Sequence, residues 1–192
     1  MDFDFTSEQN ILRETASKFF ANECPSARVK EIEESDAGYS PELWKKMAEL
    51  GWLGVMFPEN YGGYGGQFID TAIIMEEIGK AAFPSPYFST VIQCAMMILH
   101  GGSEAQKKDL LPKISDGSRI MAFAQYENDG SYLPDGIRLE ARRDGNGYIL
   151  NGIKMFVMDA NIADMLIVAA NVPDAGITLF LADAKKSGIS TS

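Results

Sequence analysis

Cysteine and histidine are scarce in this chain of 192 residues, which contains two cysteines and one histidine. Cys24 and Cys94 lie far apart and form no CxxC motif, so neither a zinc site nor a disulfide framework is expected. Both sit among apolar residues of helical spacing, which predicts buried free thiols in a reducing compartment. His100 lies beside Gly101, where it can cap a helix end, and no partners suggest a catalytic triad or a metal. We therefore predict no metal site.

Long apolar runs are also missing. No segment approaches the roughly 20 apolar residues that a membrane-spanning helix needs, and the opening MDFDFTSEQ has no signal-peptide core. We therefore expect a soluble protein of the cytoplasm. The formal net charge of -10 argues against nucleic acid or an anionic membrane as a partner. Arg138, Arg142 and Arg143 could bind an anion locally, although the solvated face of a strand is the favoured interpretation.

Apolar residues recur at helical spacing in the first part of the chain, up to about residue 118. Helices are expected over 68–82 and 87–100, and the second of these is apolar almost all round, as in a buried helix. Three further helices begin with side chains that can cap free N–H groups. These are Thr6 with Gln9, Ser40 before Pro41, and Ser103 with Gln106.

The apolar period becomes two after residue 118. Ile137, Leu139 and Ala141 alternate with charged residues, which is typical of a strand with one solvated face. The sequence DGNG at 144–147 predicts a hairpin turn, and strands are expected over 165–170 and 177–182 with a turn at 173–176. Helices first and strands afterwards predict an α+β fold with separate parts, helical over 1–118 and antiparallel β over 119–192.

Four glycines fall within the nine-residue segment PENYGGYGG, from Pro58 to Gly66. Glycine permits positive φ and the close approach of another backbone or a ligand. The segment matches neither the GxGxxG dinucleotide fingerprint nor the Walker A loop. From the residues alone, a structural role is favoured over a ligand-binding role.

Three longer segments follow one another in the order and at the spacing found in one enzyme family. They are ELGWLGVMFPENYGGYGG, GSEAQKKDLLP and GYILNGIKMFV. Over essentially its whole length, the chain resembles the first half of an acyl-CoA dehydrogenase. The resemblance implies an all-α N-terminal domain over 1–118, followed by a middle antiparallel β-barrel-like domain over 119–192 that we expect to be incomplete. The family's catalytic glutamate belongs to a C-terminal helical domain, so no catalytic residue is assigned here.

The resemblance also implies FAD as the cofactor and maps two flavin-binding stretches onto this chain. The first usually carries a threonine before Glu-Pro, followed by Ala-Gly-Ser-Asp. Here Tyr126 stands at the threonine position after Gln125, and the loop is two residues shorter. Gly130 and Ser131 remain, and they are expected to offer N–H groups and a hydroxyl to the diphosphate.

The second flavin-binding stretch usually reads Lys-Met-Trp-Ile-Thr-Asn-Gly and here reads KMFVMDA, residues 154–160. Phe156 can supply an aromatic face to the flavin, whereas Met158 cannot donate a hydrogen bond to flavin N5. An alternative interpretation makes both residues part of the barrel core. Whether FAD is retained or lost in this chain stays open at this point.

The acyl cavity of the family is lined by its fourth helix and the preceding loop, which implies Phe88, Gln93 and Met96 as substrate-binding residues for acyl-CoA. Three functions are compatible with the resemblance. In the first, the chain is part of an FAD-dependent acyl-CoA dehydrogenase that desaturates acyl-CoA thioesters in fatty acid metabolism. In the second, it is a non-catalytic subunit that supports a catalytic homologue. The third possibility is an acyl-CoA-binding protein without redox chemistry. The resemblance implies a homo- or hetero-oligomer, and the chain alone is not expected to be active.

Overall fold

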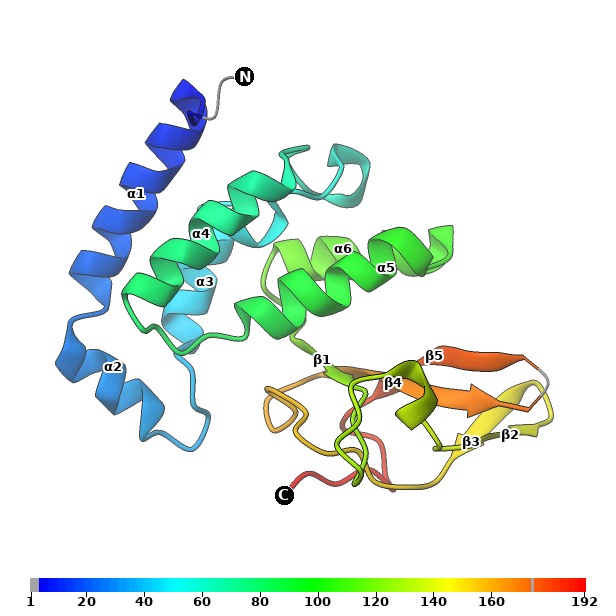
Figure 1. Ribbon diagram of the computed structural model, residues 1–192. Coiled ribbons are helices and arrows are strands. Elements are labelled where there is room, and N and C mark those ends of the chain that lie inside the picture. The colour runs from blue at the N-terminus through cyan, green and yellow to red at the C-terminus, as the bar shows by residue number, and fades with distance from the viewer. Residues whose placement is uncertain (1–3, 174) are drawn as a thin grey trace. The chain divides into compact units, whose positions relative to one another are not determined.

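The chain folds into two compact units, Met1–Ser118 and Arg119–Ser192. The computed structural model describes residues 4–173 and 175–192 (Figure 1). The first unit is helical and the second is built from strands, as the change of apolar period predicts. Each unit has its own hydrophobic interior and is described by itself.

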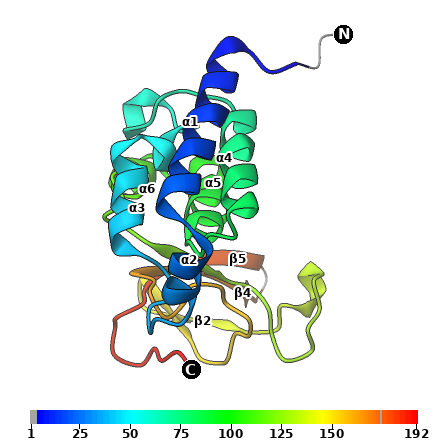
Figure 2. The same ribbon diagram turned by 90° about the vertical axis from the view of Figure 1, so that its left-hand side faces the viewer.

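The helical unit contains six α-helices and one π-helix among its described residues. They are α1 (Ser7–Glu23), α2 (Ser26–Glu33), α3 (Pro41–Glu49), α4 (Phe68–Lys80), η3 (Phe88–Cys94, the π-helix), α5 (Ala95–Gly101) and α6 (Glu104–Ser115). α1 packs along α4, and α5 packs along α6 (Figures 1 and 2). All three predicted caps are present at α1, α3 and α6. The short α2 was not predicted, because Pro25 precedes it and supplies no side-chain cap.

Large aromatic side chains fill the interior of the helical unit. The ring of Phe20 lies against those of Trp52 and Phe83, with centroids 5.8 and 5.6 Å apart. Tyr87 is fully buried, and its hydroxyl donates to the Trp52 carbonyl oxygen at 3.0 Å. Cys24 is a buried free thiol, as predicted, and burial raises its pKa to about 11.

The glycine-rich loop from Pro58 to Gly66 has a structural role in this unit. Tyr64, Gly65 and Gly66 donate backbone hydrogen bonds at 2.8–3.2 Å to carbonyls of the preceding segment, residues 54–57. A methyl group added to Gly63 would overlap the carbonyl oxygen of Phe57. The loop therefore needs glycine because two backbone segments touch there.

The second unit contains a three-stranded sheet of order β1-β4-β5, formed by β1 (Met121–Ala124), β4 (Met165–Val172) and β5 (Gly176–Asp183) (Figure 1). β4 and β5 form the predicted antiparallel pair. β1 pairs with β4 in parallel, with Met121 opposite Met165, so the prediction of a purely antiparallel unit is wrong. The long connection over 125–164 returns the chain to the same end of the sheet, which is what a parallel pair requires.

A separate hairpin pairs β2 (Ala141–Asp144) with β3 (Gly147–Leu150), and its turn falls at the predicted DGNG. The described strands form these two sheets and do not close a barrel. β2 begins four residues later than predicted from Ile137. The N–H groups of Arg138 and Leu139 bond to the Glu127 side chain instead of to a neighbouring strand. The predicted 173–176 turn includes position 174, which lies outside the described residues.

Two glycine-to-alanine changes test the interpretation of the glycine-rich loop. Gly63→Ala should lower the free energy of unfolding by about 2 kcal/mol, because the new methyl group must displace the Phe57 carbonyl. Gly79 is an exposed position of α4 where an added methyl group meets nothing within 4 Å, so Gly79→Ala should instead stabilise by roughly 0.5–1 kcal/mol. Urea unfolding of both variants measures the difference. Equal effects of the two changes would contradict the close-approach explanation.

Candidate functional site

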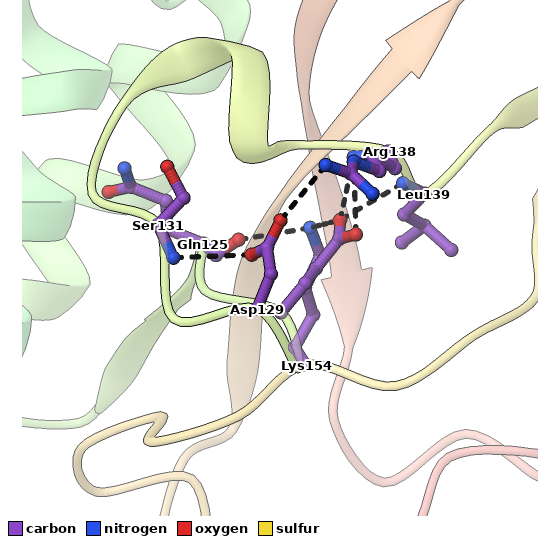
Figure 3. Close-up of polar contacts among 7 residues, drawn as sticks. Gln125, Asp129, Ser131, Arg138, Leu139 and Lys154 are labelled. Atoms are coloured by element: carbon purple, nitrogen blue, oxygen red, sulfur yellow. Dashed lines mark hydrogen bonds and ion pairs between the residues drawn. The ribbon is translucent and has the colours of Figure 1, made fainter.

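A buried ion pair joins the two stretches that were predicted to contact the cofactor. Lys154 Nζ lies 2.7 Å from Glu127 Oε1, and the two side chains are only 8% and 15% exposed. Lys154 Nζ also donates to the Gln125 carbonyl oxygen at 3.1 Å (Figure 3). Alongside these bonds, the Met155 N–H donates to the Tyr126 carbonyl oxygen at 2.9 Å. The structure therefore places the two stretches side by side.

The Glu127 carboxylate also holds a third segment. It accepts hydrogen bonds from the backbone N–H groups of Leu139, at 2.9 Å, and Arg138, at 3.1 Å. Burial raises the pKa of Glu127, but the hydrogen bond from Lys154 and the two backbone N–H groups outweigh this effect. The net result is a pKa below the usual range, so the carboxylate is ionised at neutral pH. Sequence reasoning did not single out Glu127 or Lys154.

The loop with Gly130 and Ser131 satisfies its own N–H groups. Gly130 N–H donates to the Glu127 carbonyl oxygen at 3.0 Å, and Ser131 N–H donates to Asp129 Oδ1 at 3.2 Å. The expectation that these two N–H groups face a diphosphate is therefore corrected, because both bond within the loop. Ser131 Oγ accepts from the Leu133 N–H at 3.2 Å, which leaves the hydroxyl proton able to donate to a ligand.

The three arginines proposed as an anion site do not act together. Arg138 forms an ion pair with Asp129 at 3.4 Å, which offsets the negative charge of that carboxylate (Figure 3). Arg142 and Arg143 are exposed on β2, next to its turn. The solvated strand face is therefore the better interpretation for these two.

An aromatic pair occupies the position where the family has a threonine. The rings of Tyr126 and Tyr132 meet edge to face, with centroids 5.0 Å apart and an interplanar angle of 69°. Gln125 and Tyr126 both use their carbonyl oxygens to bond to the second stretch, at Lys154 and Met155. The first stretch is thus fixed through its backbone, and Tyr126 adds a bulky ring in place of a small hydroxyl.

Phe156 and Met158 are not core residues, because Phe156 is 79% exposed and Met158 is 50% exposed. Phe156 and Asp159 adopt left-handed φ values of 52° and 60°, which non-glycine residues rarely do. The exposed Phe156 ring can stack on a flavin, and the Ser131 hydroxyl can donate to a phosphate. The residues present therefore fit FAD by ring stacking and one hydroxyl, but Met158 supplies no donor at flavin N5.

A groove of about 550 Å³ opens beside the ion pair. Its lining comes from the same three segments that Glu127 ties together. The lining residues are Glu127, Asn128, Asp129, Arg138, Leu139, Glu140, Asn151, Gly152 and Ile153. None of the six residues predicted to bind the cofactor lines this groove, so the groove is not the predicted flavin surface.

The predicted substrate residues belong to the helical unit. Phe88 and Gln93 lie in the π-helix η3, and Met96 lies in the first turn of α5. Phe88 is 41% exposed, whereas Gln93 and Met96 are partly buried. Phe88 and Gln93 thus lie in a segment with i→i+5 hydrogen bonds, which often marks a functional region, and Met96 follows directly in α5.

Within residues 4–173 and 175–192, histidine, cysteine and carboxylate side chains form no group of three or more that could hold a metal ion. Over the same ranges, no helix combines the length and the apolar character needed to cross a membrane. His100 lies exposed in the last turn of α5.

The titration of Glu127 gives a pH prediction. A carboxyl group with a lowered folded pKa stabilises the fold above its unfolded pKa of about 4.3 and loses this contribution as the pH falls through the folded pKa. Below about pH 4.3, the stability of the wild-type protein should therefore decrease as the pH falls. The stability of Glu127→Gln should decrease less steeply over the same range. Thermal unfolding between about pH 6 and pH 3 measures both slopes. Asp164 also has a lowered pKa, so some acid dependence should persist; identical slopes would contradict the assignment to Glu127.

Comparisons with known proteins cover both units. The acyl-CoA dehydrogenase N-terminal domain model matches residues 6–118. Mitochondrial isovaleryl-CoA dehydrogenase of Pongo abelii is 36% identical over 97% of this chain and 46% of its own length. An acyl-CoA dehydrogenase of Bacillus anthracis, solved in complex with FAD, has a TM-score of 0.87 and 32% identity over 98% of this chain and 33% of its own. The Tcur3481-Tcur3483 steroid ACAD has a TM-score of 0.82 and 27% identity over 98% and 50%.

The chain spans about half the length of the curated relatives it matches. The family model covers more than half of the chain, and the relatives cover nearly all of it. This protein belongs to the acyl-CoA dehydrogenase family.

Proposed function

We propose that this chain forms part of a flavin-dependent acyl-CoA dehydrogenase that introduces an α,β double bond into an acyl-CoA thioester. The observation that carries the proposal is the similarity to isovaleryl-CoA dehydrogenase over 97% of the chain, which includes both units. The buried pair of Glu127 and Lys154 supports it, because it holds the two candidate flavin-binding stretches together. We place the reaction in fatty acid metabolism and the protein in the cytoplasm.

Each candidate residue has a defined role under this proposal. Phe156 would stack its exposed ring on the isoalloxazine, and the Ser131 hydroxyl would donate to the diphosphate. Gln125, Tyr126, Gly130 and Met158 would line the same surface. Bound FAD supplies the acceptor for the hydride that leaves the substrate β carbon. The base that removes the α proton is not assigned to a residue of this chain.

The acyl-CoA would be contacted by residues of the helical unit. Phe88 offers an exposed aromatic ring, and Met96 offers a flexible apolar side chain that adapts to different acyl groups. Gln93 adds an amide that can donate to or accept from a polar group. The chemistry of these side chains suits an apolar acyl chain and does not select its length.

A second candidate function is a supporting subunit whose own flavin site has decayed. Two observations favour it: Met158 has no hydrogen to donate, and the N–H groups of Gly130 and Ser131 bond within their loop. The steroid ACAD named Tcur3481-Tcur3483 joins two components, and this chain would similarly pair with a catalytic homologue. Both candidates predict a homo- or hetero-oligomer of acyl-CoA dehydrogenase subunits.

An activity assay tests the proposed function. The chain should be tagged in its native host and purified with its natural partners, then mixed with branched-chain and straight-chain acyl-CoA substrates and an electron-accepting dye. We expect acyl-CoA-dependent bleaching of the dye and formation of the 2,3-enoyl product. Absence of both, with FAD added, would contradict a role in a dehydrogenase.

A double substitution distinguishes a decayed flavin site from an intact variant. Tyr126→Thr with Met158→Thr should tighten FAD binding by about tenfold to a hundredfold if the site has decayed, because a lost hydrogen bond of this kind weakens binding by roughly 1.5–3 kcal/mol. FAD fluorescence titration measures the Kd. A variant that also lengthens the loop before Gly130 by two residues controls for the shortened backbone. Unchanged binding in both variants would contradict the decayed-site explanation.

A further inference from the structure

We infer that Glu127 and Lys154 are positioning residues, which fix the two candidate flavin-binding stretches, residues 125–131 and 154–158, relative to each other. This rests on the proposed function, because the stretches matter for catalysis only if they hold FAD. The inference adds a role for two side chains that do not themselves face the cofactor surface, since both are largely buried.

Neither stretch is held by a sheet. β1 ends at Ala124 and β3 ends at Leu150, and the residues that follow each strand are irregular. Three bonds that join them are the Lys154 contacts to Glu127 and to the Gln125 carbonyl and one backbone bond from Met155. Removing the Lys154 ammonium would remove two of these three bonds.

The position of Phe156 depends directly on this junction. Phe156 is two residues beyond Lys154, is exposed, and adopts a left-handed backbone conformation. Asp159 adopts the same conformation three residues later. Non-glycine residues keep such conformations only where the surrounding structure determines them. The Lys154 side chain and the Met155 N–H supply the nearest fixed points before Phe156.

Glu127 fixes the other stretch at both ends of its loop. Its carboxylate accepts from the N–H groups of Arg138 and Leu139, and its carbonyl oxygen accepts from Gly130. The loop that presents Ser131 is therefore closed by bonds to one residue. Because the same carboxylate faces Lys154, the placement of Ser131 and the placement of Phe156 are coupled through one ion pair.

Hydrogen exchange on the apo chain tests the junction without requiring FAD. In Lys154→Met, the amides of Met155, Arg138 and Leu139 should exchange at least about tenfold faster, because their common anchor opens more often. Amides in β4 and β5 should speed up only by as much as the global stability falls, and less than these three amides. The control is Lys185→Met: Lys185 forms an ion pair of the same 2.7 Å length with Asp164, away from both stretches. Wild-type exchange at Met155 in Lys154→Met would overturn the inference.

FAD titration with the same proteins separates positioning from simple stability. Lys154→Arg should keep FAD affinity close to wild type, whereas Lys154→Met should weaken it about tenfold or more. The double variant Glu127→Gln with Lys154→Met removes the unpaired buried charge, so its thermal midpoint should recover while its FAD affinity stays weak. If the thermal midpoint and the FAD affinity both recover, the ion pair only stabilises the fold and the inference is overturned. If the wild-type protein itself fails to bind FAD with its partners present, the proposed function fails instead.

Discussion

A carboxylate taken out of water needs an opposite charge and hydrogen bonds to its oxygens, because the transfer otherwise costs several kcal/mol. In the sheet unit this requirement determines the course of the chain around Glu127. The ammonium of Lys154 and the N–H groups of Arg138 and Leu139 must all reach one carboxylate. The start of β2, the closure of the loop over 128–137 and the placement of the segment after β3 all follow from that single burial.

Local signals in the sequence predicted much of the fold. The caps at Thr6, Ser40 and Ser103 depend on residues three positions apart. The β4–β5 pair depends on the alternation of apolar residues within each strand. A short window of sequence is therefore enough to predict either feature. A short window cannot predict hydrogen bonds between residues that are far apart in the sequence. Nothing in residues 137–140 indicates that the N–H groups of Arg138 and Leu139 bond to a side chain 11 and 12 positions earlier. Nothing near β1 indicates a parallel partner at 165–168.

The sequence named candidate site residues but could not predict their geometry. Family resemblance selected Phe156, and its large exposed surface agrees with a surface role in place of the core alternative. The same resemblance selected Gly130 and Ser131, yet Asp129 provides an internal acceptor that takes the Ser131 N–H. A signal for Lys154 was present, since it is the one charged residue in GYILNGIKMFV, whereas Glu127 lies among polar residues beside Asn128 and Asp129. Only the structure shows that they are partners.

The π-helix η3 has a consequence for how this chain can vary over evolution. The Ala95 N–H bonds to the Thr90 carbonyl, five residues back, so this hydrogen bond spans one residue more than a bond of an α-helix. Such a segment can lose one residue and become an ordinary α-helix while α5 stays in register with α6. Phe88 would then turn to a new direction, and so would its buried neighbours Ser89, Thr90 and Val91. A single codon deletion at this point would therefore remodel one surface and repack the interior beneath it.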